Sequence, residues 1–279
     1  MKVAVLMRYP RVERAAWKRA LIEGLLERGY DVALVFGERS YAQHARAALK
    51  QYGLGAVKKR GEVAARPEPR LLGHFRDRGV PVVQVGDLNG EAGVRALRAL
   101  APDLLLLLGT GIIRKGVLDV PRVGTVHCHQ GYLPTYRGVN TIEWALYHGD
   151  DVHITAHFVD PGIDTGRILQ RERVALLPGD DVARVRERCQ QAAVPLLLRT
   201  IDAIRDGTAE PIPQAAHEGR QYFAMHPFFV DQVNRLLRER YPAGGPANGH
   251  ANAPANGQGN GLADGLADGQ IDVRANGRH

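Results

Sequence analysis

The 279-residue sequence has little cysteine and no long apolar run. Its two cysteines, Cys128 and Cys189, lie far apart and match neither zinc-ligand nor disulfide spacing, which fits a reducing, cytoplasmic compartment. No window approaches the ~20 apolar residues that a membrane span needs. The apolar stretch that opens the chain ends at Met7, too soon for a signal peptide. A disulfide scaffold and membrane insertion are therefore not expected.

The charge and the aromatic content argue against a nucleic-acid partner. The formal net charge is +7, but the arginines are spread along the chain and aromatic residues make up only 6% of it. No basic stretch carries the interleaved aromatic residues that stack on bases. Because spread positive charge attracts anionic small molecules as readily as nucleic acid, a small-molecule partner is expected.

The residues from Pro242 onward differ in composition from the rest of the chain. Residues 242–279 consist largely of Gly, Ala, Asn, Pro and Asp, contain no aromatic residue and repeat the tetrapeptide LADG. Such a segment buries too little apolar surface to offset its ordering entropy. It is therefore predicted to be a disordered, low-complexity tail.

Upstream of this tail, apolar stretches typical of strands alternate with stretches of helical spacing, such as residues 11–28. The predicted strands cover residues 2–7, 31–37, 80–86, 102–111, 123–129, 152–159 and 167–174. This alternation predicts an α/β fold with an open, mostly parallel twisted sheet. Five consecutive leucines, Leu104 to Leu108, indicate a central strand that is covered on both faces. The first strand–helix junction lacks the G-x-G-x-x-G pattern, so no dinucleotide site is predicted there.

Two helices follow from the local sequence in the second half of the chain. A short helix is predicted to be capped by Asn140 or Thr141 and to end at Gly149. A long helix over residues 180–205 is predicted to kink or break at Pro195.

His127 and His129 form an H-x-H pair at the carboxyl end of a predicted strand. Residues two apart on a strand point to the same face, and open α/β sheets bind ligands at this end of their strands. Three interpretations are compatible with the pair: a metal site completed by Asp164 or His157, an acid–base pair, or two buried polar side chains with hydrogen-bond partners. Asp164 lies in the turn DPGIDTG, where it either orients an imidazole or shapes an Asx-turn.

Two motifs that follow each other along the chain resemble those of a known family. The stretch TVHCHQGYLPTYRGVNTIEWALYHGDDVHITAHFVDPGIDTGRIL, residues 125–169, resembles the heart of the tetrahydrofolate-dependent formyltransferases. Their first motif runs Asn-x-His-x-(Ser/Gly)-x-Leu-Pro-x-x-Arg-Gly, and Asp-x-Gly-x-Asp-x-Gly follows further on. The matching residues are His127, His129, Gly131, Leu133, Pro134, Arg137, Gly138, Asp160, Gly162, Asp164 and Gly166. The motifs are closest to those of the sugar N-formyltransferases.

The resemblance implies a Rossmann-like fold and a role for each matched residue. His129 and Asp164 correspond to the catalytic histidine and aspartate, whereas His127 stands where the family has an asparagine that donates to the formyl oxygen. The residues implied for the folate co-substrate are Leu108, Gly109, Thr110, Gly111, Ile112, Ile113, Asp160 and Gly162. Those implied for the amine substrate are Gly131, Tyr132, Pro134, Tyr136, Arg137 and Gly138.

The function implied is transfer of a formyl group from N10-formyltetrahydrofolate to a primary amine of a small molecule. An amino sugar, nucleotide-linked and anionic, would suit the basic chain. One alternative is a hydrolase, either of formyltetrahydrofolate or, with a metal held by His127, His129 and Asp164, of an amide. Another is a folate- or sugar-binding protein whose catalysis the change at His127 has impaired. The leading interpretation needs no metal and is compatible with a homodimer.

This interpretation divides the chain into three parts. Residues 1–215 form the expected catalytic domain, and residues 216–241 form an extension. The segment 210–227 resembles the family's closing β-hairpin, and a helix is expected at about residues 226–240. Residues 242–279 are the predicted tail.

Overall fold

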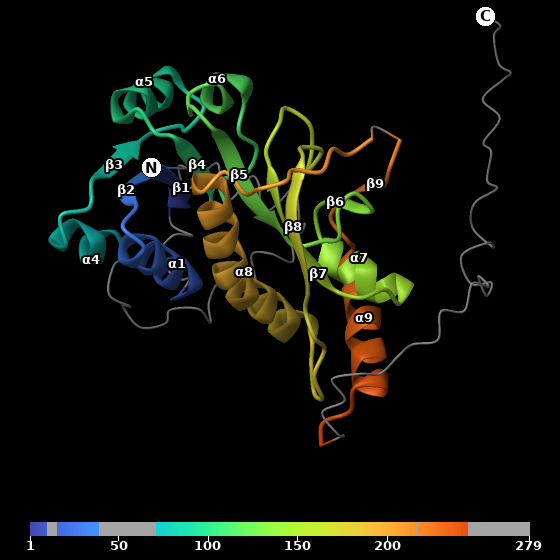
Figure 1. Ribbon diagram of the computed structural model, residues 1–279. Helices are drawn as coiled ribbons and strands as arrows, with labels where there is room; N and C mark the ends of the chain where they lie inside the picture. The colour runs from blue at the N-terminus through green and yellow to red at the C-terminus, as the bar shows by residue number, and fades with distance from the viewer. Residues whose placement is uncertain (10–15, 39–70, 216, 245–279) are drawn as a thin grey trace, which may run out of the picture. The chain divides into compact units, whose positions relative to one another are not determined.

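The structure, a computed structural model, describes residues 1–9, 16–38, 71–215 and 217–244. Figure 1 shows the strands side by side, with helices on both faces of the sheet. The strands are β1 (Lys2–Tyr9), β2 (Asp31–Glu38), β3 (Val82–Val85), β4 (Leu104–Leu107), β5 (Gly124–His129), β6 (Tyr136–Gly138), β7 (His153–Phe158), β8 (Ile168–Arg173) and β9 (Arg220–Tyr222). The helices are α1 (Ala16–Glu27), α4 (Leu71–Asp77), α5 (Glu91–Leu100), α6 (Lys115–Leu118), α7 (Thr141–His148), α8 (Val182–Arg205) and α9 (Pro227–Arg240).

Seven of these strands form one sheet in the order β3-β2-β1-β4-β5-β7-β8. The pairs from β3 to β5 are parallel, whereas β7 runs antiparallel to both β5 and β8. The sheet is open and mostly parallel, as the alternation of strands and helices predicted. The parallel strands end on one edge, where such folds bind ligands.

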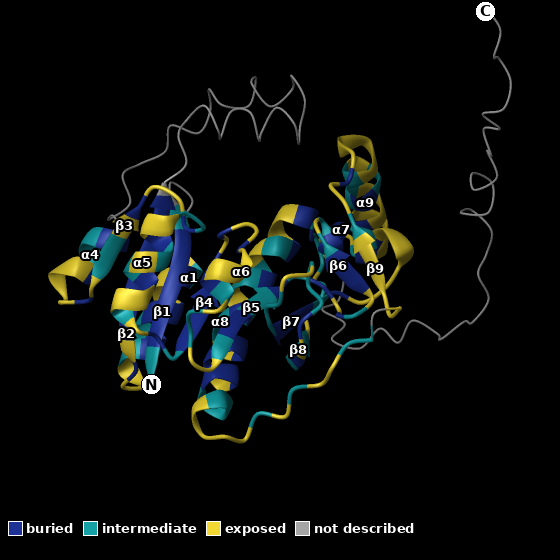
Figure 2. Cartoon of the chain, turned by 90° about the horizontal axis from the view of Figure 1, so that it is seen from above, coloured by how far each residue is buried: buried dark blue, intermediate teal, exposed yellow. Residues whose placement is uncertain are grey.

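Alternate residues of the central strands supply two hydrophobic clusters, one on each face of the sheet. Val3 and Val5 of β1 belong to the cluster that contains buried residues of α1 and α8, whereas Ala4 and Leu6 belong to the cluster with residues of α5 and α6. The four leucines of β4 are at most 5% exposed. In Figure 2, β1 is dark blue and the neighbouring helices carry yellow outer faces. The burial of these leucines confirms the central strand predicted from the leucine run. Each fully buried leucine stabilises the fold by about 1.5–3 kcal/mol.

A second, two-stranded sheet joins the C-terminal segment to the rest of the fold. β6 pairs in parallel with β9, so that Arg137 lies opposite Gln221. The helix α9 then packs against α7 and α8, and its Val233 and Leu237 are buried. The helix expected at about 226–240 is therefore confirmed.

Two local predictions need correction. α8 runs without a break through Pro195, because Leu196 and Leu197 beside it are buried against the sheet and hold the turn that proline disfavours. Asn140 is the N-cap residue of α7, one of the two predicted, but its side chain donates to Glu143 Oε1 and accepts from no backbone N–H of the helix, and Thr141 Oγ1 donates to the Gln130 carbonyl. The helix does end at Gly149, in the left-handed conformation.

The closing hairpin expected from the resemblance is not formed by the described part of residues 210–227. Ile212 pairs with Ile168 at the end of β8, and β9 pairs with β6. Glu218 and Ala215 bond to each other at the turn, but the described parts of the two halves pair with different strand edges and form no strand pair with each other. Residues 11–15 of the first predicted helix, and residues 245–279 of the predicted tail, lie outside the described residues.

Candidate active site

A cavity of about 340 Å³ lies at the carboxyl ends of β4 and β5. This volume is at the low end of the range for small-molecule sites. Its walls come from α1, the ends of β4 and β5, the start of α7 and one face of α8. The lining residues are Trp17, Leu107, Leu108, Gly109, His127, Cys128, His129, Gln130, Gly138, Val139, Asn140, Thr141, Ile142, Glu143, Arg186, Gln190 and Ala193.

Three histidines gather at the ends of β5 and β7. His127 and His157 lie directly opposite each other in the antiparallel register, with ring centroids 5.8 Å apart, and the rings of His129 and His157 are 6.4 Å apart. A residue and its antiparallel partner share one face of the sheet, as do residues two apart on a strand. The H-x-H face predicted from the sequence therefore receives a third imidazole.

Each imidazole uses one ring nitrogen on a backbone carbonyl. His127 Nδ1 lies 3.1 Å from the Leu107 oxygen, His129 Nε2 lies 2.7 Å from the Tyr136 oxygen, and His157 Nδ1 lies 2.7 Å from the Phe158 oxygen. A carbonyl oxygen can only accept, so the nitrogen facing it carries a proton. The backbone thus sets which nitrogen of each neutral ring remains unprotonated.

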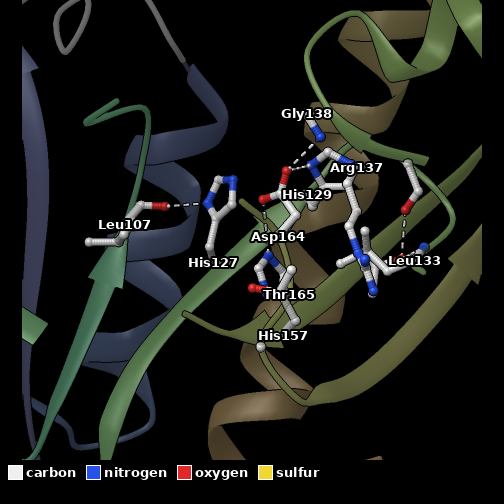
Figure 3. Close-up of polar contacts among 12 residues, drawn as sticks. Leu107, His127, His129, Leu133, Arg137, Gly138, His157, Asp164 and Thr165 are labelled. Carbon is white, nitrogen blue, oxygen red and sulfur yellow. Dashed lines mark hydrogen bonds and ion pairs between the residues drawn. The ribbon is translucent and has the colours of Figure 1, made fainter. Parts of the chain in front are cut away.

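Asp164 lies between two of these rings (Figure 3). Its Oδ2 is 3.4 Å from His129 Nδ1, its Oδ1 is 3.6 Å from His157 Nε2, and the Gly138 amide donates to Oδ2 at 2.9 Å. If both rings were neutral, each would turn a lone pair toward the carboxylate. An extra proton on either ring converts one contact into a charge-assisted hydrogen bond. Asp164 is therefore placed to share an added proton with either ring.

The electrostatics of the cluster keep Asp164 ionised and His127 neutral. Burial by itself would raise the pKa of Asp164, but the contact with His157 and the charge that the imidazoles can carry outweigh it and hold that pKa well below its usual range. Burial lowers the pKa of His127 from 6.5 to about 4, and the neighbouring His157 adds to the effect. Burial also lowers the pKa of His129, while the Asp164 carboxylate opposes that shift.

Two glycines allow the close backbone approach that places these groups. A Cβ at Gly166 would lie 1.9 Å from the Phe158 carbonyl oxygen, so only glycine lets the turn after Asp164 pack against the end of β7. A Cβ at Gly131 would lie 2.7 Å from His129 Nε2. The glycines of both motifs therefore bring the chain against the imidazoles.

The opposite wall of the cavity carries a buried ion pair. Glu143, in the first turn of α7, has a side chain that is 2% exposed, and Arg186 of α8 donates to its Oε1 through both Nε, at 2.9 Å, and Nη2. Asn140 donates to the same oxygen at 2.9 Å. Glu143 Oε2 is buried and has no hydrogen-bond partner among the described residues. The cavity therefore lies between an imidazole cluster and a glutamate–arginine pair.

The loop after β4 reaches the cavity through its first residues. Leu108 and Gly109, both predicted folate contacts, line the cavity. Lys18 of α1 donates to the Leu108 carbonyl at 2.8 Å and so holds the start of the loop. Gly111 has a φ of +74° and a Cβ there would lie 3.0 Å from the Arg8 guanidinium, which fits the need for glycine.

The remaining predicted folate contacts lie outside the lining of this cavity. The Thr110 side chain is buried and donates to the next carbonyl, and Ile113 packs into the cluster on the far face of the sheet. Ile112 is exposed. The Asp160 carboxylate accepts from the Gly162 amide at 3.1 Å, which shapes the turn leading to Asp164.

Of the residues predicted for the amine substrate, Gly138 lines the cavity. Tyr136 and Arg137 are buried: the Tyr136 hydroxyl donates to Asp150, and Arg137 donates to Gln214 at 2.9 Å. Both anchor the segment between β5 and α7 to its surroundings.

Tyr132 and Pro134 also lie outside the lining. The Arg171 guanidinium lies over the Tyr132 ring, 4.9 Å from its centroid, and Arg171 Nε donates to the Leu133 carbonyl at 2.9 Å. Through these contacts Arg171 of β8 holds the loop that contains Tyr132 and Leu133.

Several lining residues have no signal in the sequence. Trp17, Glu143, Arg186 and Gln190 come from three helices whose packing brings them together. The sequence indicates His157 only as a metal ligand, since its position opposite His127 depends on a strand register that local patterns do not set. Within residues 1–9, 16–38, 71–215 and 217–244, no three His, Cys, Asp or Glu side chains are placed to hold a metal ion.

The arrangement defines a class of protein: an open α/β enzyme fold with an acid–base site at the carboxyl ends of its parallel strands. The chain belongs to the formyl transferase family, because residues 1–201 match the family model described as "Formyl transferase". This confirms the family that the two motifs indicated. None of the helices in the described part of the chain is long and apolar enough to cross a membrane.

Individual relatives agree with this assignment. A methionyl-tRNA formyltransferase from Pelobacter propionicus is 32% identical over 159 residues, covering 56% of this chain and 49% of the relative, so the chain spans about half of that relative's length. The structure of glycinamide ribonucleotide transformylase 1 from Symbiobacterium toebii aligns with a TM-score of 0.54 at 20% identity, covering 79% of this chain and 92% of that one. An N-formyltransferase from Helicobacter canadensis, in complex with folinic acid and dTDP-3-aminofucose, aligns with a TM-score of 0.55 at 15% identity, covering 87% and 83%. These two structures share the fold.

Proposed function

We propose that this protein transfers a formyl group from N10-formyltetrahydrofolate to a primary amine. The observation that carries the proposal is the cluster of His127, His129, His157 and Asp164 beside a cavity at the carboxyl ends of β4 and β5. Family membership supports it, and so does the order of the two motifs. In the transfer, the amine nitrogen bonds to the formyl carbon and the carbonyl electron pair moves to oxygen. The bond to N10 then breaks, and one proton passes from the amine to N10.

The cluster can assist both halves of this reaction. A proton shared by Asp164 with His129 or His157 would add positive charge beside the cavity, and in other enzymes a positioned donor to the oxyanion is worth about 2.7–4 kcal/mol. Acid–base groups within reach of the reacting atoms contribute a further 10²–10⁴-fold, roughly. The assignment of His129 and Asp164 as catalytic residues rests on this geometry and on the motif.

The folate co-substrate is assigned to the loop after β4. Leu108 and Gly109 line the cavity next to His127, and the left-handed glycines leave backbone groups accessible to a ligand. The complex of the Helicobacter canadensis enzyme with folinic acid supports a folate donor. The cavity has a volume of about 340 Å³, which is enough for the reacting ends of the folate co-substrate and the amine but not for the whole of both molecules.

An amino sugar, nucleotide-linked, is the proposed acceptor. The stretch of residues 131–146 is closest to sugar N-formyltransferases, and the complex of the Helicobacter canadensis N-formyltransferase with dTDP-3-aminofucose supports such an acceptor. A second candidate is the amine of methionyl-tRNA, since the sequence relative from Pelobacter propionicus carries that name. The assay described below also tests the two alternatives, a hydrolase and a binding protein.

The test is an assay of the purified full chain with N10-formyltetrahydrofolate and separate acceptors: a nucleotide-linked amino sugar, the free amino sugar and methionyl-tRNA. Formamide product is measured by mass spectrometry and free formate by a coupled assay. Formylation of the nucleotide-linked sugar, lost in His129→Ala and Asp164→Ala, is the expected result. Formate release without any acceptor would favour the hydrolase, and folate binding without turnover would favour the binding protein. Preferential formylation of methionyl-tRNA would show that methionyl-tRNA, and not an amino sugar, is the acceptor.

A further inference from the structure

The orientation of the His127 ring is set by the sheet. Leu107 and His127 are register partners in β4 and β5, and His127 Nδ1 donates to the Leu107 carbonyl at 3.1 Å. Both strands are central in the sheet, so this carbonyl is held in place. The proton of the neutral ring therefore resides on Nδ1, and Nε2 keeps its lone pair.

The second nitrogen of His127 is open to the cavity. No hydrogen bond to His127 Nε2 is formed by the described residues, and this atom is not among the buried polar atoms that lack a partner, which are Thr125 Oγ1, Glu143 Oε2 and His157 Nε2. His127 itself lines the cavity. Figure 3 shows this nitrogen on the side of the ring turned away from Leu107.

The other two imidazoles do not offer a nitrogen in this way. His129 turns one nitrogen to the Tyr136 carbonyl and the other to Asp164, and His157 turns its nitrogens to the Phe158 carbonyl and to Asp164. Both rings are buried. Among the three rings, His127 alone combines a free lone pair with a place in the open cavity.

We propose that His127 Nε2 accepts a hydrogen bond from the acceptor amine and takes its proton as the new C–N bond forms, an inference that rests on the proposed formyl transfer. The amine lone pair bonds to the formyl carbon, and the amine proton passes to Nε2. The resulting imidazolium returns that proton to N10 when the C–N10 bond breaks, so that no other proton source is required. His127 is then the catalytic base, and His129, His157 and Asp164 act on its ring through space.

The surroundings of His127 fit this role. The low pKa of His127 keeps its ring neutral at pH 7, so the lone pair of Nε2 is present. The same low pKa makes the ring a weaker base than a free imidazole and makes the protonated ring a strong acid toward N10. The charged and titratable groups around it are His129 on its own strand, His157 on β7, Asp164 in the turn before β8, Lys18 on α1, and Glu143 and Arg186 across the cavity. An amide donor to the formyl oxygen, the role implied by the resemblance, does not follow from this tautomer.

The first test is the tautomer itself. The full-length protein labelled with ¹⁵N-histidine is examined by long-range ¹H–¹⁵N correlation at pH 7, and His127 is assigned from the spectrum of His127→Asn. A protonated Nδ1 and an unprotonated Nε2 are expected, with a shift of the Nε2 resonance when the amine acceptor is added. A proton on Nε2, or a doubly protonated ring, would overturn the inference.

The second test is a matched pair of variants at this position. In His127→Asn, the shorter side-chain amide would occupy the position of Nδ1 and bond to Leu107, whereas in His127→Gln the longer side chain would place an acceptor oxygen near the position of Nε2. For His127→Asn, kcat/KM is expected to fall roughly 10²–10⁴-fold. For His127→Gln, KM for the amine should stay near the wild-type value while kcat falls, since glutamine accepts a hydrogen bond but not the proton.

The outcomes separate this inference from the proposed function. Activity kept or raised in His127→Asn would overturn the role of base and restore that of an amide donor to the oxyanion. Wild-type transfer combined with a protonated Nε2 would overturn the inference alone. Absence of transfer by the wild-type enzyme to every amine tested would overturn the proposed function.

Discussion

The ion pair across the cavity joins two unequally buried charges. The Glu143 side chain is 2% exposed and the Arg186 side chain is 40% exposed. Replacing Arg186 with methionine keeps most of the apolar stem but removes the guanidinium. Glu143 would keep the hydrogen bond from Asn140, yet its charge would be buried without a cation bonded to it.

The cost of this change follows from the asymmetry. Removing one partner of a buried ion pair destabilises a protein by about 3–5 kcal/mol. Because water already reaches Arg186, the low end, about 3 kcal/mol, is expected for Arg186→Met. Glu143→Gln should cost less, about 1 kcal/mol, because it leaves a guanidinium that water can solvate and removes the buried charge.

Urea unfolding of the wild type, both single variants and the double variant gives the free energies of unfolding. The double variant should lose less stability than the sum of the single variants, with a coupling of about 2 kcal/mol, since it buries no unpaired charge. A loss below about 0.5 kcal/mol in Arg186→Met, the range of ordinary surface changes, would refute the reasoning. So would additive losses in the double variant.

Three further predictions concern the imidazole cluster. Asp164→Asn should lower kcat roughly 10²–10⁴-fold with an unchanged circular dichroism spectrum, because the cluster loses the carboxylate that retains its proton; wild-type turnover would remove Asp164 from the mechanism. Because the pKa of His127 falls from 6.5 to about 4 on folding, protonation favours the unfolded chain, so stability is unaffected above pH 6.5 and is lost as the pH drops toward 4. Asp164 adds its own loss only as the pH falls below its ordinary pKa of 3.8, outside this window, so His127→Gln should show a shallower decline between pH 6.5 and 4 in urea unfolding, and equal slopes would contradict the assignment. Gly166→Ala should destabilise the fold by about 1–3 kcal/mol and lower transfer, because its Cβ would lie 1.9 Å from the Phe158 oxygen; a melting temperature equal to that of the wild type would show that the turn can shift.

The central strand of the sheet was predictable because the pattern that indicates it lies within a few consecutive residues. Five consecutive leucines between turn residues favour a strand covered on both faces, and the structure places β4 in the middle of the sheet. The same local reasoning wrongly predicts a break at Pro195, since the sequence shows the missing N–H but not the packing of Leu196 and Leu197 that retains the helix. Local rules describe what a residue disfavours, and tertiary packing decides whether that preference prevails.

The site was predictable in part for a similar reason. Strand alternation places His127 and His129 on one face wherever the strand lies. The approach of His157 depends on the register of β5 with β7, and the approach of Glu143 and Arg186 depends on how α7 and α8 pack. No spacing in the sequence encodes either distance, so these residues appear only in the folded chain.

The position of the His127 proton shows how far a main-chain atom can determine side-chain chemistry. An asparagine at this position would carry two N–H groups, so one could bond to the Leu107 carbonyl while the other still faced the substrate. A neutral imidazole has a single N–H, and here the Leu107 carbonyl takes it. Asparagine and histidine would therefore present opposite hydrogen-bonding character to the cavity from the same backbone. The change at residue 127 exchanges a donor for an acceptor, and the group that can use an acceptor is the amine.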